Sequence, residues 1–109
     1  MEQGGTNGKE AYMTTFFMFG KYSSEAVKEI HPERTRKSLK IIKAMGGKLK
    51  GMYALLGDYD LVLIVECPDI DTIVKISIEL HMLTGIHFSS LPAMPVDYFD
   101  ALISRNSRK

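Results

Sequence analysis

Three polar side chains, Ser77, His81 and Thr84, recur at one-turn spacing in an apolar segment. Projected at about 100° per residue, they fall near the middle of an apolar helix face. Polar groups on such a face must find hydrogen-bond partners or line a cavity. If His81 faces a pocket between this helix and a sheet, its neutral imidazole is a ligand contact or a base. The alternative is a buried, hydrogen-bonded histidine packed on the sheet.

Two further histidines, His31 and His87, complete the set. No pair of the three has the helical or hairpin spacing that metal ligands show, so we predict neither a metal site nor a cofactor. His87 starts a predicted strand close behind His81, which makes it a second candidate for contact with a ligand. The single cysteine, Cys67, has no basic neighbour and is followed by Pro68-Asp69, so we interpret it as structural.

The tetrapeptide Gly57-Asp58-Tyr59-Asp60 separates two apolar runs. Glycine and aspartate tolerate the backbone angles that reverse a chain, so these residues predict the turn of a β-hairpin. Tyr59 and Asp60 are candidates for a ligand-binding turn. The alternative is that Asp58 shapes the turn while Tyr59 packs at the edge of a dimer.

The elements that position these residues follow a known order. Strands are predicted over 12–19, 48–56, 61–67 and 86–91, and helices over 32–45 and from Asp69 or Asp71 to Leu83. A short turn to Ile30 and a terminal helix over 97–103 complete the domain, which we place at 11–103 between a leader (1–10) and a frayed tail (104–109). The order predicts an α+β, ferredoxin-like βαββαβ fold: a four-stranded antiparallel sheet with two helices on one face.

Both faces of the predicted sheet are apolar. Leu61, Leu63 and Val65 alternate with Val62 and Ile64. Similar alternation in the preceding strand places Leu49, Tyr53 and Leu55 on one face. An uncovered face of this kind usually marks association, so we predict a homodimer, or a multiple of dimers, that packs sheet against sheet. The alternative is that the segment after Pro95 folds back over the open face.

Composition excludes several classes of partner. The 109 residues carry a net charge of +1, which gives no indication of nucleic-acid binding. The longest apolar run, Leu61 to Val65, is far shorter than a membrane helix requires. A single cysteine fits a reducing compartment, and we expect the protein in the cytoplasm. The basic side chains at Arg34, Arg36, Lys37, Lys40 and Lys43 are interpreted as a solvated helix face, with anion binding as the alternative.

An ordered set of motifs resembles the GYD family of small bacterial and archaeal proteins. The set comprises Lys21-Tyr22, Pro32-Glu33-Arg34, Gly46-Gly47-Lys48-Leu49-Lys50, Gly57-Asp58-Tyr59-Asp60, Pro68-Asp69 and Leu91-Pro92-Ala93-Met94. The resemblance implies a dimeric α+β barrel and implies no reaction. The chain departs from the family pattern at His81 and Pro92. A weaker resemblance, over 57–91, is to the effector domain of leucine-responsive-type transcription regulators.

From these observations we expect a homodimer that binds a small apolar or aromatic molecule between its helices and its sheet. The predicted ligand contacts are Ser77, His81, His87, Tyr59 and Asp60. One alternative is a cofactor-independent enzyme of the monooxygenase or isomerase type, which requires a proton-carrying histidine or tyrosine. A second is a stand-alone effector or oligomerisation module.

Overall fold

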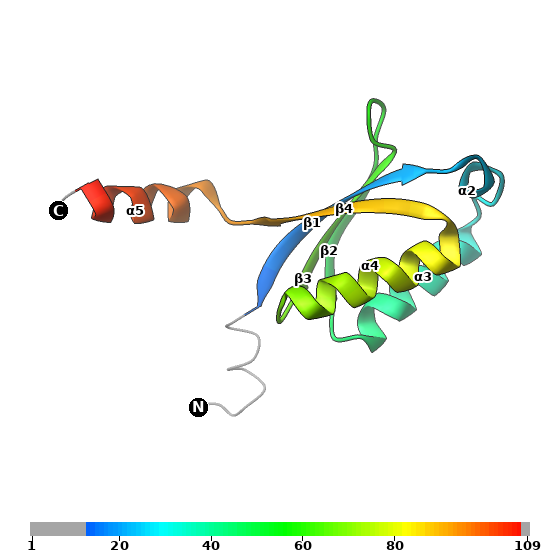
Figure 1. Ribbon diagram of the computed structural model, residues 1–109, viewed down its shortest axis with the longest axis horizontal. Coiled ribbons are helices and arrows are strands. Elements are labelled where there is room, and N and C mark those ends of the chain that lie inside the picture. The colour runs from blue at the N-terminus through cyan, green and yellow to red at the C-terminus, as the bar shows by residue number, and fades with distance from the viewer. Residues whose placement is uncertain (1–12, 108–109) are drawn as a thin grey trace.

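Figure 1 shows the computed structural model, which describes residues 13–107. The predicted leader, residues 1–10, lies outside the described residues. Four strands form one antiparallel sheet in the order β2-β3-β1-β4. The strands are β1 (Thr14–Tyr22), β2 (Lys48–Ala54), β3 (Leu61–Cys67) and β4 (Ile86–Ala93), and the helices are α2 (Ser24–Lys28), α3 (Pro32–Ala44), α4 (Ile70–Thr84) and α5 (Val96–Ser107). The predicted ferredoxin-like order is therefore confirmed.

Helices α3 and α4 lie side by side against the same face of the sheet (Figure 1). The core fills the space between the two layers, because alternate strand residues and one stripe of each helix point into it. Its most completely buried side chains are Met18, Ile42, Leu63, Ile76, Leu80, Val65 and Cys67. In β3, Leu61, Leu63 and Val65 share this face, as the predicted alternation requires.

The other sheet face carries a band of apolar side chains, which we call the open face. The register aligns Phe17 with Ile64 and Leu91, and Phe19 with Val62. The ring centroids of Phe19 and Tyr59 are 5.3 Å apart, so the β2–β3 loop adds an aromatic ring to the band. Tyr53 and Leu91 keep 61% and 54% of their surface exposed. The band is too apolar for a sheet face that meets water along its whole length.

A β-bulge in β2 corrects one predicted face. Leu49 pairs with Val65, but the next paired residue is Gly51, opposite Ile64, so Lys50 is an extra residue. Leu49 therefore shares the helix-covered face with Met52, and Tyr53 lies on the open face. The prediction that placed Leu49 and Tyr53 together was wrong, because simple alternation cannot anticipate the inserted residue.

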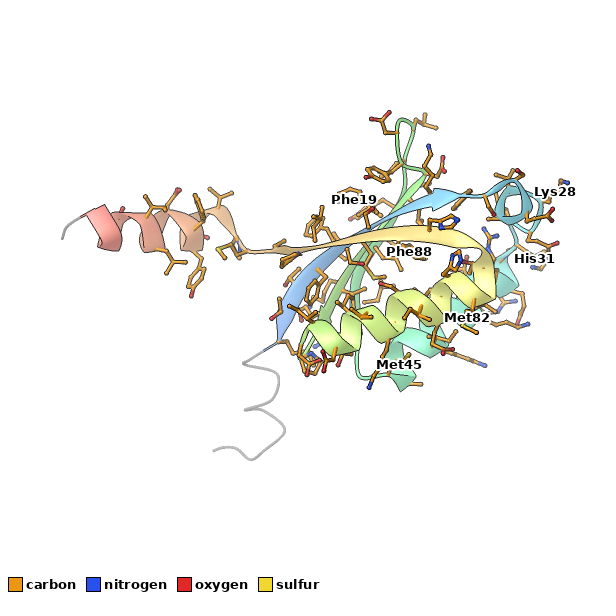
Figure 2. All side chains as sticks on the ribbon, viewed as in Figure 1. Phe19, Lys28, His31, Met45, Met82 and Phe88 are labelled. Atoms are coloured by element: carbon orange, nitrogen blue, oxygen red, sulfur yellow. The ribbon has the colours of Figure 1, made fainter. Side chains whose placement is uncertain are left out.

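Helix α5 stands apart from the rest of the molecule, at the end of an arm that continues β4 (Figures 1 and 2). It does not fold back over the open face, which was the alternative to a dimer. The extended arm raises the radius of gyration to 16.2 Å, whereas a compact domain of this length has about 13 Å. The helix also continues to Ser107, beyond its predicted end at Ile103 and into the predicted tail. Within the described residues, no helix combines the length and apolar character needed to cross a membrane.

Helix α4, which carries most of the predicted site, is fixed at both ends. Gly85 ends it in a left-handed conformation with φ of 76°, where a side chain is disfavoured. At the start, Asp69 Oδ1 accepts hydrogen bonds from the Thr72 hydroxyl and backbone N–H, at 2.7 and 2.9 Å. The bond from the Thr72 hydroxyl, followed by that from the N–H, lowers the pKa of Asp69 below its ordinary value of 3.8. Asp69, rather than Asp71, is therefore the N-cap.

A lowered carboxyl pKa makes this cap pH-dependent. The stabilisation is complete above the unfolded-state pKa and is lost as the pH falls through the folded-state pKa. We expect Asp69→Asn to keep a capping oxygen but to lose this part of the pH dependence. Thermal unfolding followed by circular dichroism, from neutral pH to about pH 3, measures the difference, with Asp71→Asn as the control. A constant offset between wild type and Asp69→Asn over this range contradicts the assignment.

Candidate functional site

A pocket of about 230 Å³ lies between the helix layer and the sheet, next to the end of β1. Apolar side chains from β2, β3, β4 and α4 form most of its wall, and α3 closes one side. The lining residues are Tyr22, Arg34, Thr35, Ser38, Met52, Ala54, Leu61, Leu63, Leu80, Thr84, Ile86 and Phe88. The volume equals the share of roughly seven or eight water molecules in the liquid, so an occupant must be small.

Arg34 is the charged residue in the lining. It lies in the first turn of α3 and is half-buried, whereas the neighbouring Arg36 and Lys37 are exposed. Its Nη1 donates a hydrogen bond to the backbone oxygen of Ala26, and its Cζ lies 5.5 Å from the centre of the Tyr22 ring. The stacked ring and the carbonyl hold the guanidinium at the pocket. Arg34 therefore does not belong to the solvated basic face to which we assigned it.

The two hydroxyl groups deep in the lining are already engaged. Ser38 Oγ donates to the backbone oxygen of Arg34 at 2.9 Å. Thr84 Oγ1 donates to the backbone oxygen of Leu80 at 2.6 Å and accepts from the Ile86 N–H at 3.0 Å. Thr84 is buried, as the helix projection implied. Both hydroxyls fix the backbone around the pocket, so their hydrogens are not directed at an occupant.

Asp60 fastens the β2–β3 loop to the end of β1. Its Oδ2 accepts from the Tyr22 N–H at 2.8 Å, and its own N–H donates to the Gly20 oxygen at 2.9 Å. Lys21 Nζ donates to the backbone oxygen of Asp58 at 2.8 Å, which adds a second attachment. Asp60, rather than Asp58, thus supplies the carboxylate that shapes this region. Through Tyr22 it positions one wall of the pocket, although it does not line the pocket itself.

His81 does not face the pocket, which corrects our placement of it on the buried helix face. Its ring is exposed, Nδ1 donates to the Ile86 oxygen at 2.9 Å, and the His87 ring centre lies 4.5 Å away. The error arose because the outer residues of α4 are also apolar: Ile70 and Val74 are 66% and 48% exposed. Including them moved the centre of the projected apolar face towards His81.

Ser77 lies in a separate hollow between α4 and β4. Its Oγ is 3.1 Å from Ser90 Oγ, so the two hydroxyls form a hydrogen bond across the helix–strand contact. This hollow measures about 320 Å³. Of the predicted ligand contacts, Ser77 lines this hollow, His81 and His87 stack at the edge strand, and Tyr59 and Asp60 lie in the loop. The structure therefore brings none of the five to the pocket, and their ligand contacts stay predictions.

Cys67 is completely buried, and this burial raises the pKa of its thiol, which favours the protonated form. Among residues 13–107 there is no group of three or more His, Cys, Asp or Glu side chains placed to hold a metal ion.

Sequence reasoning missed the pocket residues on α3. The sequence does contain a pattern that indicates them. Arg34, Ser38 and Ile42 are spaced by four residues and therefore share one helix face. Ile42 and Ser38 are 1% and 6% exposed. Helical spacing from a core isoleucine was enough to place Arg34 on the inner side, but the four nearby basic residues concealed it.

Comparison with solved structures shows the same fold in a leucine response regulatory protein and in an AsnC family transcriptional regulator. The leucine response regulatory protein LrpA of Mycobacterium tuberculosis superposes with a TM-score of 0.58 at 9% identity, over 87% of this chain and 58% of that one. An AsnC family transcriptional regulator from Agrobacterium tumefaciens gives 0.55 at 18% identity, over 90% of this chain and 65% of that one. The chain thus spans about six tenths of each regulator's length.

A search of curated proteins gave no match to the sequence. A family model does match: the GYD domain aligns with residues 16–103, which include β2, β3, β4, most of β1, the pocket and the loop that Asp60 fastens. The match covers most of the chain. It contains the tetrapeptide Gly57-Asp58-Tyr59-Asp60, which is one of the motifs that resemble the family. The chain therefore belongs to the GYD domain family.

Proposed function

We propose that this protein is a homodimer that binds a small apolar or aromatic metabolite in the pocket between α3, α4 and the sheet. The pocket itself is the observation that carries the proposal. Its walls are mainly apolar, it contains few polar groups, among them Arg34, and its 230 Å³ is below the roughly 300–1,000 Å³ of sites for drug-sized molecules. A metabolite with a compact apolar body fits these dimensions.

Dimerisation through the open face supports the same proposal. Phe17, Phe19 and Tyr53 lie on that face with no covering helix in the described part of the chain. Pairing two open faces around a two-fold axis covers both bands at once. The pocket lies on the opposite side of the sheet, so ligand binding and dimerisation use different surfaces. A cytoplasmic location accords with the lone cysteine and remains part of the proposal.

The lining favours binding over acid–base catalysis. Within residues 13–107 no histidine, cysteine or carboxylate side chain lines the pocket. An enzyme of the monooxygenase or isomerase type would have to use Tyr22 as its proton carrier. The fold shared with the two regulators favours a second candidate, a stand-alone effector or oligomerisation module, in which ligand binding biases assembly.

Native mass spectrometry of the protein from its own source tests the proposal. We expect a dimer, or a multiple of dimers, with additional mass from a bound metabolite. Ala54→Phe enlarges a side chain of the pocket lining, and it is expected to fill the space and abolish the additional mass, with the dimer retained. Ala44→Phe, at the exposed end of α3, is the matched control and keeps the ligand. A monomer contradicts the dimer, and added mass that persists in Ala54→Phe contradicts the pocket.

A further inference from the structure

Among residues 13–107, no carboxylate forms an ion pair with Arg34. Its hydrogen bond goes to the neutral backbone oxygen of Ala26. The ion pair nearby joins Arg36 to Glu33, on the exposed side of α3. A half-buried guanidinium loses part of its hydration, and a neutral carbonyl restores only some of that free energy. The pocket therefore contains a positive charge that an incoming anion can stabilise.

The carboxylates closest to this region do not compete for the pocket side of Arg34. Glu29 and Glu33 border a different, outer hollow that Arg34 also lines. Glu33 is held by Arg36 through two hydrogen bonds, and Glu29 is exposed to solvent. A guanidinium has five N–H donors in a planar fork, and one is used by Ala26. Donors thus remain for a second, bidentate partner.

The other lining residues indicate what kind of molecule carries the group that pairs with Arg34. The hydroxyls of Ser38 and Thr84 donate to backbone oxygens. The rest of the wall is mainly apolar, with Met52, Leu63 and Phe88, apart from Tyr22 and Thr35, which lie next to Arg34. An occupant therefore has one end that suits a guanidinium and a body that suits aliphatic and aromatic carbon.

We propose that the ligand of this pocket is a small monocarboxylate with a branched aliphatic or aromatic body, whose carboxylate pairs with Arg34. This inference rests on the proposed function and adds the chemical class of the ligand. A carboxylate matches the guanidinium fork with two parallel hydrogen bonds. Arg34 is the single cationic side chain in the described lining, which favours one negative charge over the two that a phosphate monoester carries.

Matched acid and amide probes test the charge without changing the shape. Phenylacetate with phenylacetamide, and isovalerate with isovaleramide, are titrated into the full-length protein and followed by calorimetry and NMR. We expect each acid to bind at least about tenfold more tightly than its amide, because charge-assisted hydrogen bonds are roughly twice as strong as neutral ones. Binding of the acid is expected to disappear in Ala54→Phe, which places it in the pocket.

Variants of α3 assign the preference to Arg34. Arg34→Gln removes the charge and is expected to abolish the difference between acid and amide. Arg34→Lys keeps the charge but not the fork, so an intermediate preference is expected. Lys40→Gln removes an exposed charge farther along α3 and leaves the Arg36–Glu33 pair intact, so it is the control that keeps the full preference. Circular dichroism and thermal unfolding establish that each variant is folded, and Arg34→Lys still tests the inference if Arg34→Gln does not fold.

The outcomes separate the two proposals. Equal binding of acid and amide overturns the carboxylate inference and leaves the binding function intact. An acid preference that survives in Arg34→Gln, or is lost equally in Lys40→Gln, also overturns it. No binding of any acid or amide counts against the binding function itself.

Discussion

Ile64→Lys is expected to convert the proposed dimer into a monomer that remains folded. Ile64 lies at the centre of the open face, opposite Phe17 on one neighbouring strand and Gly51 on the other. Burying an isoleucine side chain contributes about 1.5–3 kcal/mol, and burying an unpaired ammonium costs several more. The two-fold axis places the change twice in each dimer, so the association constant should fall by at least roughly a thousandfold.

The measurement is the mass of the particle, by native mass spectrometry or by light scattering at several protein concentrations. Ile78→Lys is the matched control, because Ile78 is 52% exposed on α4, on the helix side of the sheet. It places the same charge on the same domain without touching the open face, so its dimer should persist. A dimer of undiminished strength in Ile64→Lys refutes the packing of sheet against sheet.

Leu80→Ala should have the largest effect on the stability of the domain. Leu80 is 1% exposed and lies between the core and the pocket, so truncation enlarges an existing cavity. Substitutions of this kind lower the free energy of unfolding by about 2–5 kcal/mol. The whole free energy of unfolding of a domain of this size is only about 5–15 kcal/mol. We expect a lower midpoint of denaturant unfolding, and partial recovery when an apolar ligand fills the enlarged space.

Leu83→Ala provides the comparison for this experiment. Leu83 is one turn along the same helix but is 38% exposed, so the same three carbon atoms are removed from a surface position. Its expected cost is below about 1 kcal/mol. Both variants must be measured at one protein concentration, because dissociation of a dimer contributes to the midpoint. If Leu80→Ala and Leu83→Ala lower the free energy of unfolding equally, the buried face of α4 has been assigned incorrectly.

The fold was predictable because it depends on local patterns that reinforce one another. The turn signal at Gly57 to Asp60, the helix stop at Gly46-Gly47 and the cap at Asp69 each mark an element boundary, and the order of elements leaves few topologies. Alternation in β3 also separated its two faces correctly, with Leu61, Leu63 and Val65 on one face and Val62 and Ile64 on the other. These signals act over a few residues, so a single sequence contains them in full.

The site was less predictable because it depends on which of two apolar helix faces is buried. Helix α4 is apolar on its inner face and also on part of its outer face, and the residue types alone do not distinguish them. His81 was therefore placed inside, although its ring lies beside His87. Arg34 was placed outside, although Tyr22 and Ala26 hold it at the pocket. Both errors concern tertiary contacts that periodicity does not record.

The bulge in β2 decides which face is taken by each residue before it. Leu49 lies opposite Val65 only because Lys50 is an extra residue between it and Gly51. If the bulge closed while the hairpin kept its pairing, Lys50 would move opposite Val65, on the helix-covered face, and Leu49 would turn to the open face, because one residue of slip exchanges the two faces. Deleting Lys50 would instead leave Leu49 opposite Val65. The strand is therefore expected to tolerate the loss of the exposed residue at position 50 better than the loss of the bulge.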